Sequence, residues 1–194
     1  MTGKMRNNKH RYKILGMVLI GAGLLLIGFA AWVFLPKPDV GGTKDLEEIS
    51  AIPAVAAYKA PELSLNDLDG SPVSLSDFAG QVVLVNNWAT WCPPCKAEMP
   101  ILQGYYEDHN DQGFTIVAIE AGDSPEAVAE FVNEYGLTFP VWPDLEQKAL
   151  DAFRNPNLPN SAVIDRNGAV RYVWTGTITR NALEEYITPL VEER

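Results

Sequence analysis

Hydrophobic residues in the second half of the chain fall into short continuous runs. Residues 82–85 and 114–119 are runs rich in β-branched side chains, which is typical of strands buried on both faces of a sheet. Residues 162–164 and 170–174 are two further apolar runs, separated by Asp165-Arg166-Asn167-Gly168. The Asn-Gly pair favours a tight hairpin turn, so these runs predict two antiparallel strands.

Helical spacing appears between and after these predicted strands. Ser124 and Pro125 suit the cap and first position of a helix that Gly136 ends, and Thr179 begins a last helix with one apolar face. Two more helices are expected over residues 96–109, with a kink at Pro100, and 146–153. The order is strand, helix, strand, helix, helix, strand, strand, helix. It predicts an α/β domain with a central sheet covered on both faces.

The longest apolar stretch lies near the start of the chain. Residues 14–35 are 22 residues without a charge, and a helix needs about 20 such residues to cross a bilayer. Residues 1–13 carry five basic side chains and no acid, which favours keeping this end in the cytoplasm and exporting the rest. We expect a single transmembrane anchor. A cleaved signal peptide is the alternative, although its apolar region is usually shorter, about 7–15 residues.

Charged residues are distributed unequally before and after this apolar stretch. The net charge is −10, but residues 36–194 hold ten basic and all 25 acidic residues. An acidic domain of this kind argues against nucleic-acid binding. Residues 36–59 contain prolines, glycines and acids with little periodicity and are expected to form an irregular linker. The alternative is a short helix from Asp45 to Ala57. Residues 60–194 are expected to form the folded domain.

The chain has only two cysteines, Cys92 and Cys95, placed where a buried strand gives way to a helix. A structural zinc site needs about four ligands, and a purely structural disulfide would close too short a loop to stabilise the fold much. At a helix N-terminus the free N–H groups and the helix dipole favour a thiolate at Cys92, with Cys95 one turn later. The intervening Pro93 and Pro94 stiffen the turn. The pattern favours a redox-active pair.

The segment VVLVNNWATWCPPCKAEMPIL resembles the active-site strand and helix of thioredoxin-fold proteins. In particular it is similar to the membrane-anchored TlpA/ResA group of bacterial thiol-disulfide oxidoreductases, which includes the CcmG-type proteins of cytochrome c maturation. Further matching pieces extend the resemblance over about residues 60–192: Ala60-Pro61, LSDF at 75–78, Phe139-Pro140-Val141 and Leu158-Pro159. The resemblance implies a thioredoxin-like fold, a central mixed sheet flanked by helices, with an N-terminal β extension after the single transmembrane helix.

Site residues follow from the same resemblance. Cys92 matches the exposed nucleophile and Cys95 the buried resolving cysteine, while Glu98 matches an acid placed in a cavity near the second cysteine. A solvated capping charge is the alternative role for Glu98. Pro159 matches a cis-proline that lies beside the cysteines and leaves a backbone edge for the substrate. The expected substrate-binding residues are Trp91, Pro93, Pro94, Leu158 and Pro159.

Two departures from the family pattern bear on the mechanism. Ordinary thioredoxins carry a buried Asp six residues before the first cysteine, where this chain has Asn86, which cannot titrate. Proton transfer to Cys95 must then involve Glu98, water or another group. Asn160 and Ser161 follow Pro159 where relatives often have two threonines, so substrate contacts are expected to differ.

The function implied is that of an extracytoplasmic, membrane-tethered thiol-disulfide oxidoreductase of a bacterial cell. The absence of a His between the cysteines favours a reductant of protein disulfides, with apocytochrome c as the implied substrate and a CcdA/DsbD-type membrane protein as the electron donor. No cofactor beyond the cysteine pair, and no metal, is expected. A Cu(I) chaperone is the alternative, because soft thiolates select Cu(I), but no Met- or His-rich cluster accompanies the pair.

Overall fold

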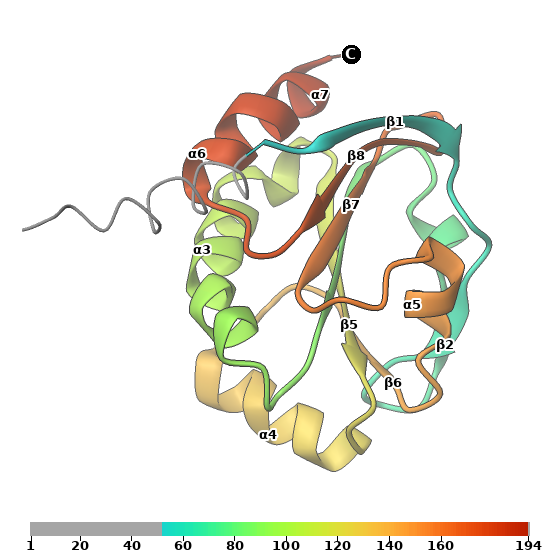
Figure 1. Ribbon diagram of the computed structural model, residues 1–194, viewed down its shortest axis with the longest axis vertical. Coiled ribbons are helices and arrows are strands. Elements are labelled where there is room, and N and C mark those ends of the chain that lie inside the picture. Colours follow the sequence, from blue (N-terminus) through green and yellow to red (C-terminus); the bar gives the residue numbers. More distant parts are fainter. Residues whose placement is uncertain (1–51, 194) are drawn as a thin grey trace, which may run out of the picture. The chain divides into compact units, whose positions relative to one another are not determined.

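A six-stranded mixed sheet forms the centre of the domain (Figure 1). The computed structural model describes residues 52–193, so the predicted basic segment, the membrane anchor and most of the linker lie outside the described residues. The strand order is β1-β8-β7-β4-β5-β6. The strands are β1 (Ala54–Lys59), β4 (Val82–Trp88), β5 (Phe114–Ala121), β6 (Val141–Asp144), β7 (Asn160–Ile164) and β8 (Ala169–Thr175).

The central strands β4 and β5 are buried along their whole length, as their continuous apolar runs predict. Strands β4, β5 and β6 are parallel, and the crossovers between them contain α3 (Pro93–His109) and α4 (Pro125–Tyr135). Both crossovers step in the same direction along the sheet, so their shared right-handedness places both helices on one face. Strands β7, β8 and β1 add to the other side of β4 in antiparallel pairs.

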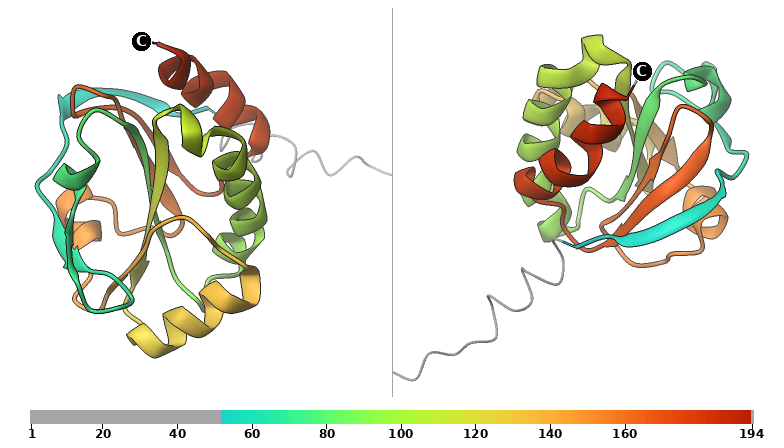
Figure 2. Two further views of the ribbon diagram at one scale, coloured as in Figure 1. Left: turned by 180° about the vertical axis from the view of Figure 1, so that it is seen from behind. Right: turned by 90° about the horizontal axis from the view of Figure 1, so that it is seen from above.

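Each face of the sheet carries its own hydrophobic layer. On one face, α3, α4 and the C-terminal helix enclose a cluster that contains both cysteines. On the other face, a second cluster lies under α5 (Lys148–Phe153) and the hairpin of β2 (Ser64–Asn66) and β3 (Pro72–Ser74). The view from above in Figure 2 separates the two layers. This is the α/β arrangement that the sequence predicts, and β2 and β3 supply the expected β extension.

Local signals placed most of the helices correctly. The Ser124 side chain accepts a hydrogen bond from the Ala127 N–H at 3.4 Å, and Gly136 ends α4 with a φ of 64°, in the left-handed region that glycine adopts freely. Helix α3 begins at Pro93, three residues before the predicted start, and continues through Pro100. Pro93 and Pro94 occupy first-turn positions, where a missing N–H is not needed.

The prediction of an irregular linker is wrong at its C-terminal end, because residues 54–59 form strand β1. The alternative helix ending at Ala57 is wrong over the same described residues. Strand β1 pairs antiparallel with β8 at the sheet edge, and most of its side chains are exposed. Backbone hydrogen bonds therefore hold this strand, and its alanine-rich sequence has no inward and outward alternation that could reveal it.

Two further elements differ from the predicted order. Strand β6 is absent from it, since the strand is short and contains Pro143, which the edge position tolerates because one side needs no N–H donor. The last helix is divided into α6 (Arg180–Ala182), a wider π-type turn over residues 183–187 and α7 (Thr188–Glu192). Pro189 lacks the N–H that a regular helix would donate to the preceding turn, which accounts for the widening.

No helix within residues 52–193 is both long enough and apolar enough to cross a membrane.

Candidate redox site

The two cysteines lie at the point where β4 ends and α3 begins. They form a disulfide with an S–S distance of 2.02 Å and a Cα–Cα distance of 5.3 Å. Cys92 is the N-cap residue of α3, and its Sγ accepts a hydrogen bond from the Cys95 N–H at 3.3 Å. The helix N-terminus thus offers the Cys92 sulfur a donor that stabilises negative charge.

Accessibility separates the two sulfurs less than the sequence suggests. In the disulfide form Cys92 is 4% exposed and Cys95 is fully buried. Cys92 is therefore the more accessible of the pair, but it is not an exposed residue. The predicted neighbours Trp91, Pro93 and Pro94 are exposed around it, and Trp91 retains 65% of its accessible surface.

Glu98 lies one turn after Cys95 on the buried side of α3 and is 1% exposed. Its Oε1 accepts a hydrogen bond from Asn86 Nδ2 at 2.9 Å, and its Oε2 accepts one from the Ile178 backbone N–H at 3.0 Å. Burial raises the Glu98 pKa to about 7, although both hydrogen bonds lower it. The solvated capping role is wrong, since the carboxyl group lies inside the protein on the same helix face as Cys95.

Asn86 connects this carboxyl group to β7. Its Nδ2 also donates to Ser161 Oγ at 3.0 Å, and the two residues are register neighbours on β4 and β7. The Asn86 Oδ1 atom is buried and has no hydrogen-bond partner among the described residues. An amide that rotates by 180° would present this oxygen to a protonated Glu98, so Asn86 can serve either protonation state of the acid.

The loop before β7 brings the predicted cis-proline to the site. The Leu158–Pro159 peptide bond is cis, and Leu158 packs against the core cluster that contains both cysteines. The Pro159 carbonyl accepts a hydrogen bond from the Gly176 N–H at 2.8 Å. Asn87 on β4 pairs in register with Asn160, so Pro159 comes next to the end of β4, which leads to Cys92. All eight predicted site residues are thus gathered on α3, the preceding turn and this loop.

A second buried amide pair holds the same loop and was not predicted from the sequence. Asn87 Nδ2 donates to Asn160 Oδ1 at 2.8 Å. Asn160 Nδ2 in turn donates to the backbone carbonyls of Asn155 at 3.2 Å and Asn157 at 2.7 Å. An asparagine inside an apolar strand, as at position 87, is the one sequence signal that could have revealed it, because buried polar groups need partners.

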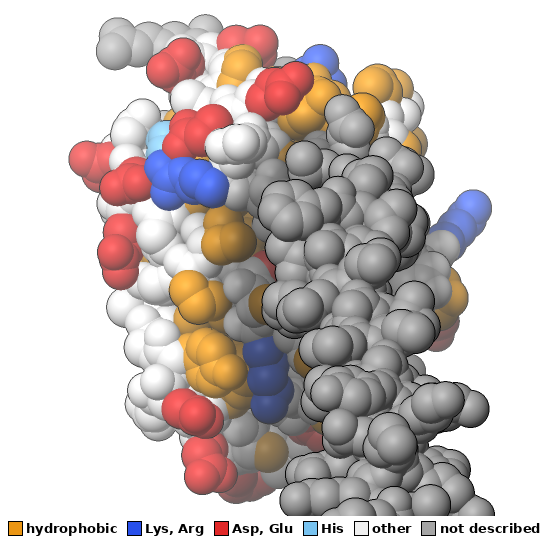
Figure 3. Space-filling view, turned by 60° about the vertical axis from the view of Figure 1, so that its left-hand side comes forward, with side chains coloured by type: hydrophobic (Ala, Val, Ile, Leu, Met, Phe, Trp, Pro, Cys, Tyr) orange, Lys and Arg blue, Asp and Glu red, His pale blue; other side chains and the backbone are white. Residues whose placement is uncertain are grey.

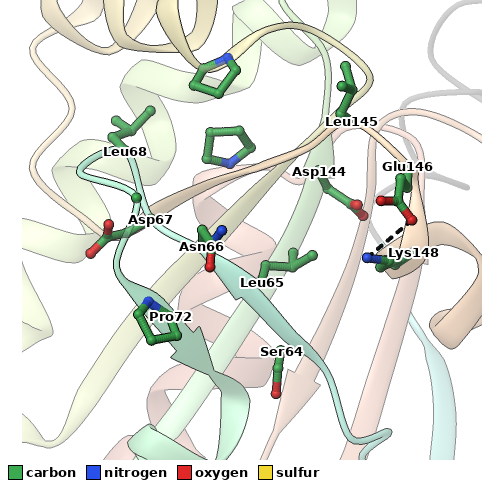
Figure 4. Close-up of a pocket in the computed structure, with 13 residues that line it drawn as sticks. Ser64, Leu65, Asn66, Asp67, Leu68, Pro72, Asp144, Leu145, Glu146 and Lys148 are labelled. Atoms are coloured by element: carbon green, nitrogen blue, oxygen red, sulfur yellow. Dashed lines mark ion pairs between the residues drawn. The ribbon is translucent and has the colours of Figure 1, made fainter.

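Two cavities of the domain lie away from the cysteines. One of about 540 Å³ runs between the β2–β3 hairpin and the segment from β6 to α5, with Asp67 and Leu68 on one side and Leu145 on the other (Figure 4). Another, of about 630 Å³, lies near Lys59 and Arg166. Neither is lined by a cysteine or by Glu98. Within the described part of the chain no three His, Cys, Asp or Glu side chains are grouped to hold a metal ion.

Comparison with known proteins agrees with this geometry. The model of the AhpC/TSA family matches residues 56–173. A thiol-disulfide oxidoreductase ResA of Oceanobacillus iheyensis is 32% identical over 194 residues, covering 100% of this chain and 96% of its own. The ResA protein of Bacillus subtilis is 40% identical over 128 residues, covering 66% of this chain and 72% of its own.

Solved structures give the same result for the fold. A crystal structure described as a putative thiol:disulfide interchange protein DsbE from Chlorobium tepidum superimposes with a TM-score of 0.66 at 28% identity, covering 70% of this chain and 97% of that one. A putative thioredoxin from Neisseria meningitidis has a TM-score of 0.64 at 32% identity, covering 70% and 92%. The chain belongs to the AhpC/TSA family of thioredoxin-fold proteins and is a thiol-disulfide oxidoreductase.

Proposed function

We propose that the protein reduces protein disulfides outside the cytoplasm while residues 14–35 hold it in the membrane. The observation that carries the proposal is the cysteine pair at the start of α3, with the more accessible cysteine, Cys92, at the helix N-cap. The similarity to the Oceanobacillus relative extends over the whole chain, which supports a shared N-terminal segment. The oxidising surroundings of an exported domain give a reductant its substrates.

The proposed reaction passes two electrons from the cysteine pair to the substrate. The Cys92 thiolate attacks one sulfur of a substrate disulfide, and the other sulfur leaves as a thiolate that takes up a proton. Cys95 then loses its proton and attacks the Cys92 Sγ, so that the bond between Cys92 and the substrate breaks and the second substrate sulfur leaves as a thiolate that takes up a proton. The products are a substrate dithiol and the Cys92–Cys95 disulfide.

Glu98 is the proposed acceptor of the Cys95 proton. An acid with a pKa of about 7 is present at neutral pH in comparable amounts of acid and base, the condition in which it exchanges protons most effectively. No aspartate stands at position 86, and Asn86 instead donates a hydrogen bond to the acid. The Pro159 loop provides the edge against which the substrate backbone lies, with Trp91 and Leu158 as its apolar contacts.

The proposed substrate is apocytochrome c, whose haem-attachment cysteines must be reduced, and the proposed donor is a CcdA/DsbD-type membrane protein. The acidic surface suits a basic partner. Figure 3 shows the side of the domain that carries α3, where acidic side chains are spread over the described part with few Lys or Arg among them.

A trapping experiment tests this function. In the full-length Cys95→Ala protein the mixed disulfide cannot be resolved, so membranes of the native host should contain a covalent Cys92 adduct that a reductant releases. Mass spectrometry of the adduct should identify a protein with a pair of closely spaced cysteines. The control is the variant that lacks both cysteines. A protein that forms no Cys92-dependent adduct and instead binds Cu(I) stoichiometrically would refute the proposal in favour of the copper chaperone.

A further inference from the structure

A second buried acid, Glu120, lies beside the active-site turn. It occupies the carboxyl end of β5 as the register neighbour of Trp88 and is fully buried. Its Oε2 accepts a hydrogen bond from the Asp123 backbone N–H at 2.9 Å. Its Oε1 is buried without a hydrogen-bond partner among the described residues. Burying an acid in this way costs free energy, and an apolar residue would fit the strand better.

Glu120 and Asp123 hold the turn that leads to Cys92. The Cys92 N–H donates to the Ala89 carbonyl at 3.2 Å, which closes a four-residue turn with Thr90 at its second position. The Thr90 hydroxyl donates to Asp123 Oδ2, and the Asp123 backbone N–H donates to Glu120 Oε2. Asp123 therefore connects Thr90 in the active-site turn to the buried acid.

We propose that Glu120 is a positioning residue for Cys92 that acts through Asp123 and Thr90. The two acids fix the turn, and the turn fixes the Cys92 sulfur at the helix N-terminus, where it meets the Cys95 N–H. This inference rests on the proposed function, because it assigns Glu120 a part in the reactivity of the nucleophile. We call this group of three residues the turn clamp: Thr90, Asp123 and Glu120.

The clamp contains a titratable pair. Burial raises the Glu120 pKa to about 7, the side chain of Asp123 raises it further, and the Asp123 and Thr90 N–H groups lower it. The negative charge of Asp123 acts in the same direction as burial. The other charged side chains of neighbouring elements near this end of the sheet are Lys96 and Glu98 of α3, Glu126 of α4, Asp144 of β6 and Lys148 of α5.

Three of these groups, Lys96, Glu98 and Asp144, make contacts elsewhere. Lys96 lies 5.9 Å from the centre of the Phe131 ring, and Glu98 bonds to Asn86 and the Ile178 N–H. Asp144 accepts the Ala149 N–H at 2.8 Å.

The protonation state of Glu120 then determines how firmly the turn clamp holds the turn. While Glu120 holds its proton, the neighbouring Glu120 and Asp123 carboxyl groups do not repel each other and the turn is fixed. Loss of that proton places two negative charges side by side, which loosens the turn. The reactivity of Cys92 is therefore expected to depend on Glu120 above neutral pH and to be independent of it in mildly acidic solution.

The test measures alkylation of Cys92 in the full-length Cys95→Ala protein, where it is the only thiol. Rates with iodoacetamide are recorded from pH 5.5 to 9. Glu120→Gln copies the protonated acid and keeps the turn fixed at every pH, so it should lower the apparent pKa of Cys92 by about half a unit. Rates should match those of the parent below pH 6. The control is Glu130→Gln, which makes the same charge change at an exposed position of α4.

Substitutions of Thr90 test whether Glu120 acts on Cys92 through Asp123 and Thr90. Thr90→Val removes the hydroxyl and should raise the apparent pKa of Cys92, Thr90→Ser should restore it, and Glu120→Gln should have no further effect in the Thr90→Val background. Equal pH profiles of the alkylation rate for Glu120→Gln and Glu130→Gln would overturn the inference. Additive effects of Glu120→Gln and Thr90→Val on the apparent pKa of Cys92 would overturn it as well. Should Glu120→Gln fail to fold, the Thr90 pair still decides, because Thr90 is only partly buried. Alkylation needs no substrate, so a failure here is distinct from a failure of trapping.

Discussion

Replacement of Glu98 by Gln should change how the stability of the protein depends on pH. The folded state binds the Glu98 proton more tightly than the unfolded state, since the pKa rises from 4.5 to about 7 on burial. Below pH 4.5 both states are protonated and the acid costs nothing. Between 4.5 and 7 the unfolded state ionises first, so stability falls as pH rises, and above 7 the loss is complete.

The size of this loss follows from the shift. A change of one pKa unit corresponds to 1.36 kcal/mol, so the rise to about 7 amounts to about 3 kcal/mol of stability lost between pH 4 and pH 8. Glu98→Gln removes the ionisation but alters the hydrogen bond with Asn86, which adds an offset that does not depend on pH. The ionisation of Glu98 is therefore measured only by how the difference in unfolding free energy between Glu98→Gln and the parent changes with pH.

The assay is urea unfolding of the oxidised full-length protein in a mild detergent, followed by tryptophan fluorescence at several pH values from 4 to 8. The free energy of unfolding of Glu98→Gln, relative to that of the parent, should rise by about 3 kcal/mol over this range. Glu130→Gln, at an exposed position, is the matched control and should show no comparable rise. A difference for Glu98→Gln that stays constant with pH would show that burial does not disfavour the charged acid, and the proton-transfer role would lose its support.

Three further predictions concern the scaffold and the substrate loop. Arg166 donates to five backbone carbonyls, so Arg166→Lys should lower the free energy of unfolding by about 2 kcal/mol in urea titrations. Gly113→Ala should cost about 1–2 kcal/mol, because its φ is 77° and a Cβ would lie 2.7 Å from the Arg166 guanidinium; the cost should shrink in the Arg166→Lys background. Asn160→Thr frees the carbonyls of the loop before Pro159, and steady-state kinetics should show KM for a protein disulfide raised about tenfold with Cys92 alkylation unchanged.

The elements that the sequence predicted well are those whose own residues carry the signal. Strands β4 and β5 are continuous apolar runs, and α4 has a capping Ser and a closing Gly, so local physics suffices for them. Strands β1 and β6 escaped prediction because they lie at the sheet edges. The mostly exposed side chains of β1 show no alternation, and β6 is a run of only four residues that contains Pro143, so neither strand carries a clear local signal.

The site divides in the same way. Cys92 and Cys95 are close in sequence, and their place between a strand and a helix indicated their chemistry. Pro159 could be assigned only through the resemblance to a family. The pairing of Asn87 with Asn160 joins residues 73 positions apart, and the contact of Thr90 with Asp123 joins residues 33 apart. Such pairs depend on strand register, which the sequence does not specify by itself.

The buried polar groups at the two ends of the sheet differ in how completely their hydrogen bonds are made. At the amino ends of β4 and β5, Arg166 meets backbone carbonyls from several segments, and every partner is a fixed acceptor. At the carboxyl ends, beside the cysteines, the buried groups include Asn86, Glu98 and Glu120, and the pKa of each of the two acids is raised to about 7. Orphaned oxygens on Asn86 and Glu120 reduce stability there. A site that accepts and releases protons needs side chains whose hydrogen bonds are not all made in a single protonation state. The stability lost at this end of the sheet is therefore consistent with proton exchange beside the disulfide.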